Sequence, residues 1–73
     1  MTAFEIINQI EADKVANHRK PKEALKIEVI KIAQAMGMAF AKEIMEAEIT
    51  ELERQGKVIL GETLNDNYII VLR

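Results

Sequence analysis

The chain has 73 residues, of which 49% are hydrophobic and 30% are charged, and its formal net charge at pH 7 is −2. A chain this short forms one domain, which we place over residues 1–73. The composition is too hydrophobic for a disordered tail and too charged for a membrane segment, so we expect a globular protein of the cytoplasm. The sequence has no Cys, Ser or Trp, which excludes disulfides, thiolate metal sites and Ser or Cys nucleophiles.

The first pattern along the chain predicts a helix over residues 3–16. Thr2 and Glu5 have the spacing of a capping box, in which the hydroxyl accepts an amide N–H and the carboxylate reaches back to another. Apolar residues recur at helical spacing until polar residues take over. A basic connector, residues 18–22, follows and contains the only proline. Because proline suits the first position of a helix, we expect Pro21 to open the next one.

Helical spacing of apolar residues then predicts a second helix over residues 21–36 and a third over residues 39–55. Gly37 and Gly56 follow these helices, and glycine readily adopts the left-handed conformation that ends a helix. Glu48 lies close to the apolar stripe of the third helix. An unpaired carboxylate is costly in such a place, so we expect Glu48 at the edge of the stripe or beside a cation.

Two short runs rich in β-branched residues, 58–60 and 68–72, predict a C-terminal β-hairpin over residues 58–72. The segment Asn65-Asp66-Asn67 tolerates left-handed conformations and is the predicted turn, while Gly61 is a candidate β-bulge. An isolated hairpin is marginally stable in water, so it must pack on the helices. We therefore predict an α+β fold in which a three-helix core carries a C-terminal β-hairpin.

Three stretches of this chain resemble the winged helix-turn-helix superfamily: Ile32-Ala33-Gln34-Ala35-Met36-Gly37-Met38, Ile49-Thr50-Glu51-Leu52-Glu53-Arg54-Gln55-Gly56-Lys57-Val58 and Gly61-Glu62-Thr63-Leu64-Asn65-Asp66-Asn67-Tyr68. In that superfamily the third helix enters the major groove of DNA, and the hairpin, or wing, often reaches a flanking groove. The resemblance implies a winged-helix-like domain and a small, non-enzymatic DNA-binding protein that acts in transcription regulation. It also places the start of the second helix near the DNA backbone.

The positive charge of the chain is concentrated in residues 14–31, where six basic and two acidic residues give a net charge of +4 and leave −6 for the remainder. We expect a surface that contacts phosphates around the basic connector, assisted by the amides at the start of the second helix. The predicted DNA-binding residues are Arg19, Lys20, Lys22 and Lys26, with Lys42 nearby. The alternative is an ordinary solvated surface without a ligand.

The acidic residues of the third helix favour a second interpretation. The exposed positions early in this helix include Glu43 and Glu46, and the wing turn has Glu62 and Asp66 without a Lys or Arg. An acidic face is repelled by phosphates. The alternative function is therefore a winged-helix-like protein-interaction module, whose contact with a protein partner is made by the acidic third helix or by the apolar hairpin.

The last predicted strand is apolar on both faces, although one face of a two-stranded wing should be solvated. One explanation is that another element covers the second face. The other is that Ile59, Ile69 and Val71 mark a partner interface, including that of a homodimer, for which an edge strand offers unpaired backbone groups.

The remaining residue types indicate neither catalysis nor metal binding. His18 is the sole histidine and has no second His or Cys at the spacing of a metal site, so we expect an exposed loop residue and no metal. The carboxylates have no fixed partner across a cleft, as paired-carboxylate catalysis would require. We predict a protein that is not an enzyme, without catalytic residues and without a cofactor.

Overall fold

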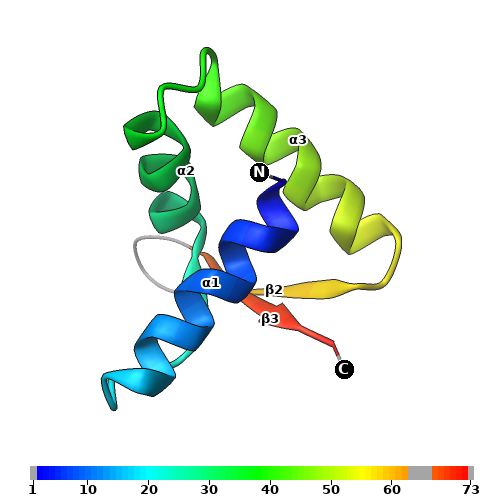
Figure 1. Ribbon diagram of the computed structural model, residues 1–73. Helices are drawn as coiled ribbons and strands as arrows, with labels where there is room; N and C mark the ends of the chain where they lie inside the picture. Colours follow the sequence, from blue (N-terminus) through cyan, green and yellow to red (C-terminus); the bar gives the residue numbers. More distant parts are fainter. Residues whose placement is uncertain (1, 63–66, 73) are drawn as a thin grey trace.

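The structure is a computed structural model that describes residues 2–62 and 67–72. Over these residues the protein has an α+β fold with three helices and a three-stranded antiparallel sheet, which confirms the predicted fold class (Figure 1). The elements in chain order are α1 (Ala3–Ala16), β1 (Ala24–Leu25), α2 (Lys26–Ala35), α3 (Ala41–Arg54), β2 (Val58–Glu62) and β3 (Asn67–Val71). None of the helices in the described part of the chain has the length and apolar character that a membrane crossing requires.

Helix α1 has the predicted bounds, and its first turn is capped by side chains. The Thr2 Oγ1 accepts a hydrogen bond from the Glu5 N–H at 3.3 Å, and the Glu5 carboxylate accepts one from the Thr2 N–H at 2.9 Å. These bonds satisfy amides that have no partner within the helix. Ile6, Ile7 and Ile10 form the buried face of α1.

Helix α2 begins at Lys26, so the prediction that Pro21 opens this helix is wrong. Residues 24 and 25 are extended and form β1, in which Ala24 pairs with Ile69 and Leu25 with Tyr68 of β3. Ala24 is completely buried. The pairing with a strand more than forty positions away decides the local conformation here, and tertiary contacts of this kind override local helix propensity.

Left-handed residues mark the ends of α2 and α3 and the start of α3. Gly37 has φ +83° and Gly56 has φ +74°, each just past a helix as predicted. Helix α3 starts at Ala41, two residues later than predicted, because Phe40 before it has φ +54°. A left-handed residue cannot belong to a right-handed helix.

Strands β2 and β3 form the predicted hairpin in a continuous antiparallel register. Gly61 pairs directly with Tyr68, so the expected bulge at Gly61 is wrong for the paired residues described. Asn67 is the first residue of β3, and the rest of the predicted turn, Asn65 and Asp66, lies outside the described residues. Strand β1 pairs with the other edge of β3, which gives the sheet order β1-β3-β2.

The alternation of side chains along the hairpin gives the sheet an inner face and an outer face. Val58 and Ile69 point inward and are almost completely buried, whereas the cross-strand pair Ile59 and Ile70 points outward and is 50% and 40% exposed. Leu72, two residues after Ile70, is also exposed. The helices therefore cover one face of the sheet and leave the other open, as far as the described residues show.

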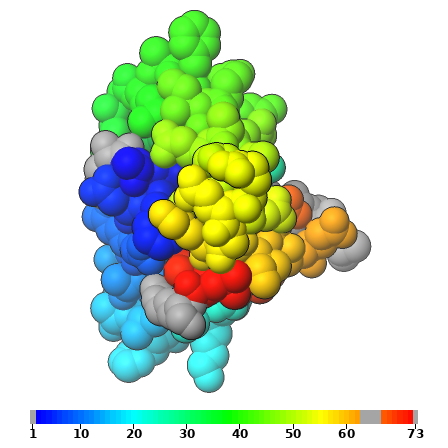
Figure 2. All heavy atoms as spheres, turned by 90° about the vertical axis from the view of Figure 1, so that its right-hand side faces the viewer, coloured from blue at the N-terminus to red at the C-terminus, as the bar shows by residue number. Residues whose placement is uncertain are grey.

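The hydrophobic core lies between the three helices and the inner face of the sheet. Its buried members are Ala3, Ile6, Ile7, Ile10, Ala24, Val29, Ile30, Ala33, Ala41, Met45, Ile49, Val58 and Ile69. Figure 2 shows the far ends of β2 and β3, in orange, projecting from the body of the molecule. The hairpin is thus anchored through its inner face near β1 and the helices.

Replacement of Ile69 by Ala should lower the free energy of unfolding by about 2–5 kcal/mol, because it removes buried methyl groups and leaves a cavity. Ile70→Ala, the next position on the same strand but on the outer face, should cost less than about 1 kcal/mol. Urea unfolding followed by circular dichroism measures both values. Equal losses in the two variants would contradict the assignment of the two faces.

Candidate functional site

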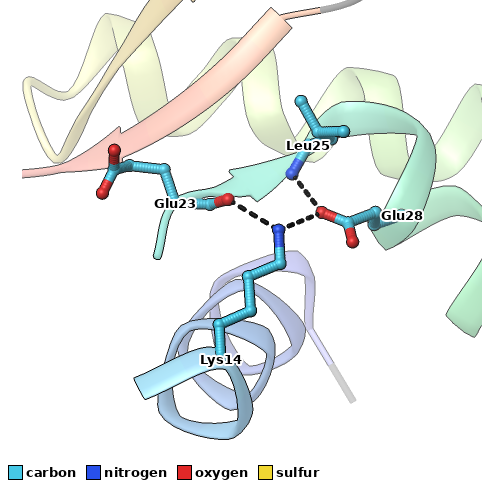
Figure 3. A network of polar contacts seen from close by, with 4 residues as sticks. All are labelled: Lys14, Glu23, Leu25 and Glu28. Atoms are coloured by element: carbon cyan, nitrogen blue, oxygen red, sulfur yellow. Dashed lines mark hydrogen bonds and ion pairs between the residues drawn. The ribbon is translucent and has the colours of Figure 1, made fainter. Parts of the chain in front are cut away.

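An ion pair between buried Lys14 and half-buried Glu28 joins the end of α1 to the start of α2 (Figure 3). The Lys14 Nζ lies 2.7 Å from the Glu28 Oε1 and donates a second hydrogen bond to the Glu23 carbonyl oxygen at 2.9 Å. The same Glu28 oxygen accepts the Leu25 N–H at 2.8 Å. The Lys14 side chain is only 8% exposed. One ammonium group therefore ties α1, the residue before β1 and the first turn of α2 together.

The charge of Glu28 is stabilised by this network. Partial burial by itself would raise the pKa of Glu28, but the hydrogen bonds from Lys14 and from Leu25, with the positive charges of Lys14 and Arg19, hold the pKa below its ordinary value of 4.5. Glu28 is therefore ionised at neutral pH and compensates Lys14. As a result, Lys14 adds no uncompensated charge to the surface, although it is one of the basic residues of the positive segment.

A left-handed histidine turns the chain at the end of α1. His18 has φ +54°, and its N–H donates to the Val15 carbonyl oxygen at 3.2 Å. The Arg19 N–H donates to the Lys14 carbonyl oxygen at 2.8 Å. These two bonds form a Schellman motif, which satisfies the last carbonyl groups of a helix.

Helices α2 and α3 end in the same pair of bonds, but there the left-handed position is occupied by Gly37 and Gly56. A residue with a Cβ atom is less stable than glycine in this conformation, by about 1–2 kcal/mol. His18 therefore occupies a position where the backbone would favour glycine, and the end of α1 differs in this respect from the ends of α2 and α3.

The residues around this turn border an open hollow of about 360 Å³. We call it the basic hollow; it is lined by Val15, His18, Arg19, Lys20 and Lys22. Among the residues that the structure describes, no acidic side chain lines it. The three cationic residues are exposed, and Val15, which is 57% exposed, gives the hollow an apolar wall. An anion placed here meets positive charge without a competing carboxylate.

Arg19, Lys20 and Lys22 are the predicted DNA-binding residues that the structure brings together. Lys26 lies in the first turn of α2, is half-buried and does not line the basic hollow. Lys42 lies at the start of α3, at the top of Figures 1 and 2, whereas the basic connector is at the bottom of both views. Lys42 therefore belongs to a separate surface.

The predicted partner-binding residues lie on different surfaces, and one of them lies in the core. Glu43 is exposed and Glu46 is half-buried on α3, and Ile59 is exposed on the outer face of the sheet. Val71 is half-buried and packs against the core. Ile69 is completely buried among core residues, so its prediction as an interface residue is wrong.

The apolar outer face is formed by residues whose positions follow from the strand register. With Ile69 directed inward, Ile70 joins Ile59 on the outer face, and Gly61 and Tyr68 form the next pair on the same side. The described strand positions on this face hold no charged residue. Strand β1 adds Leu25 beside Tyr68. No element within the described residues covers this outer face of the sheet, so the first explanation for its apolar character does not hold for them.

Glu48 has a partner that the sequence does not identify. Its Oε1 accepts a hydrogen bond from the Ala3 N–H at 2.7 Å, and Glu48 is half-buried. A carboxylate at this place complements the positive end of the α1 dipole. Of the two alternatives, the half-burial of Glu48 fits the edge position, and its partner is a backbone amide and not a cation.

Val15 and His18 line the basic hollow but are not among the predicted site residues. Both residues line the hollow because the left-handed turn after α1 brings them next to the basic connector. The one sequence signal is the missing glycine at the end of the first helix, since a Schellman motif usually has glycine there.

Comparison of the chain with protein-family models, with curated proteins and with solved structures gives no match. The function of this protein is therefore inferred from its own residues and their geometry.

Replacement of Glu28 by Gln should lower the free energy of unfolding by about 1–2 kcal/mol at neutral pH, because Gln keeps an acceptor oxygen but leaves the Lys14 ammonium without a counter-charge. The lowered pKa of Glu28 means that its ionised form stabilises the fold above its ordinary value of 4.5 and that this contribution is lost as the pH falls through the lowered value.

The difference in stability between the wild type and Glu28→Gln should therefore shrink on acidification from neutral pH to about pH 3. Urea unfolding of both proteins at the two pH values measures the change. The contributions of the other carboxylates cancel in the difference, because both proteins contain them. A difference that stays constant, or grows in acid, would contradict the role assigned to this carboxylate.

Proposed function

We propose that this protein is a winged-helix-type DNA-binding protein that holds the phosphate backbone through its basic connector. The observation that carries the proposal is the convergence of Arg19, Lys20 and Lys22 around one hollow that no described acidic side chain lines. Phosphate contacts of Lys and Arg supply most of the affinity in non-specific binding to DNA. The protein acts by binding and has no catalytic step.

The arrangement of the helices supports this proposal. Helices α2 and α3 are joined by five residues that include Gly37, and a two-stranded hairpin follows α3. Two helices joined by a short glycine-containing turn are typical of DNA-binding helix-turn-helix proteins. The basic connector precedes α2, the helix whose start the winged-helix resemblance places near the DNA backbone.

The acidic surface of α3 sets the mode of binding. Exposed Glu43 follows Lys42 at the start of this helix, and Glu53 is exposed near its end, where Glu51 is paired with Arg54. These carboxylates oppose insertion of α3 between two phosphate chains. Binding through the basic connector alone reads the backbone rather than the bases, so the protein discriminates weakly between DNA sequences.

The double variant Lys20→Glu with Lys22→Glu should bind a labelled mixed-sequence duplex more weakly than the wild type and should lower the slope of log affinity against log salt by about 2. For the wild type, about three phosphate contacts predict a loss of roughly 40-fold between ~50 and ~200 mM salt. Fluorescence anisotropy measures both quantities, and circular dichroism checks the fold.

Lys42→Glu is the matched control for this experiment. It reverses an exposed lysine at the other end of the molecule and should change the affinity only slightly. Unchanged duplex binding in the folded double variant would remove the basic connector from consideration. A large loss in Lys42→Glu instead would indicate that α3 enters the groove in the way usual for the superfamily.

A protein-interaction module is the second candidate function, and the outer face of the sheet favours it. Ile59, Ile70 and Leu72 are exposed together there, and β2 is an edge strand of the sheet. Because the described positions of this face are uncharged, two copies can approach without repulsion between like charges. A monomer mass that is independent of concentration in light scattering would exclude self-association through this face.

A further inference from the structure

We propose that the basic hollow is a binding site for one unpaired nucleotide of a single-stranded nucleic acid, with its base against Val15 and His18 and its phosphate at the cationic side chains. This inference rests on the proposed function and deepens it, because it names the unpaired strand as the preferred ligand. A duplex can offer phosphates to the connector, but its bases are stacked and paired and cannot enter the hollow.

The size and walls of the basic hollow fit this ligand. Its volume of about 360 Å³ lies near the lower end of the ~300–1,000 Å³ found for small-molecule sites, and the hollow is open to solvent. Val15 lines the hollow and is 57% exposed, so it offers an apolar wall for the face of a base. Phosphate binding alone needs positive charge on a surface and has no use for such a wall.

His18 and Arg19 add two planar groups to the same hollow. Unpaired bases stack on histidine rings and on arginine guanidinium planes, and such stacking tolerates any base because every base has a π-face. The remaining cations, Lys20 and Lys22, are compact charges suited to the phosphates on either side of the base. Of the five lining residues, Val15, His18 and Arg19 therefore suit the base, whereas Lys20 and Lys22 suit the nucleic-acid backbone.

The left-handed conformation of His18 supports a role beyond the fold. In α2 and α3 the same position of the same motif is held by Gly37 and Gly56, so the motif itself favours glycine at position 18. Backbone conformations that are unfavourable for a side chain concentrate at functional sites, where the side chain is needed. We assign the need to the side chain of His18, a residue that lines the basic hollow.

The Lys14 network fixes the chain at the two ends of the segment that carries the basic hollow. Val15 and His18 follow Lys14 on the chain, and Lys22 precedes Glu23, whose carbonyl oxygen accepts a bond from Lys14. The Glu23 side of the hollow is thus bonded to the ammonium group of Lys14, a residue of α1, and α1 leads into the other side. Glu28 is paired with Lys14, although its charge also interacts with that of Arg19.

The test is fluorescence anisotropy with three labelled probes of equal length: a mixed-sequence single strand, its duplex, and a single strand with abasic sites in place of its bases. We expect the wild type to bind the single strand at least ~5-fold more tightly than the abasic strand, because stacking of one base contributes at least this factor. His18→Gly should reduce this preference for the normal strand, while the unfolding midpoint stays the same or rises.

Val15→Ala is a second variant that removes the apolar wall at an exposed position and should also lower the preference for the normal strand. Ile59→Ala, an equally exposed apolar residue on the hairpin, is the matched control and should leave the preference unchanged. Equal affinity of the wild type for the normal and abasic strands, with duplex binding intact, would overturn this inference alone. Absence of binding to all three probes at ~50 mM salt would overturn the proposed function as well.

Discussion

The buried contact between Lys14 and Glu28 determines where the basic connector lies. Lys14 reaches out of α1 and bonds a backbone carbonyl before β1 and a carboxylate in α2, and the same carboxylate bonds the backbone of β1. Strand β1, only two residues long, is placed by this network on one side and by its pairing with β3 on the other. The segment between α1 and β1 is therefore held at both ends, with its cationic side chains outside.

The basic residues of the positive segment have two different roles, which cannot be distinguished from the sequence alone. Lys14 is enclosed and neutralised, while Arg19, Lys20 and Lys22 line a hollow without a described carboxylate. Helix α3, which carries exposed Glu43 and Glu53, lies away from the connector (Figure 1). The protein thus presents a concentrated positive surface although its net charge is −2, and such local charge rather than the net charge determines contact with phosphates.

Much of the fold is predictable from the sequence because its signals are local: the capping box of α1, Gly37 and Gly56, and the change from helical to β-type residues after Gly56. Strand β1 is not predictable, since two residues have no periodicity and their conformation depends on β3. The inward direction of Ile69 is hidden in a continuous apolar run and becomes clear only from the register. The site is predictable in part: the three connector cations come from composition, whereas Val15 and His18 depend on the left-handed turn.

The central claim is that nucleic acid contacts the basic hollow and not α3. The most direct measurement is a titration of ¹⁵N-labelled protein with a short single strand at ~50 mM salt, followed by NMR of the backbone amides. The account predicts that the largest shifts fall on residues 15–22, with small shifts in α3. Shifts concentrated in α3 and the hairpin would contradict it.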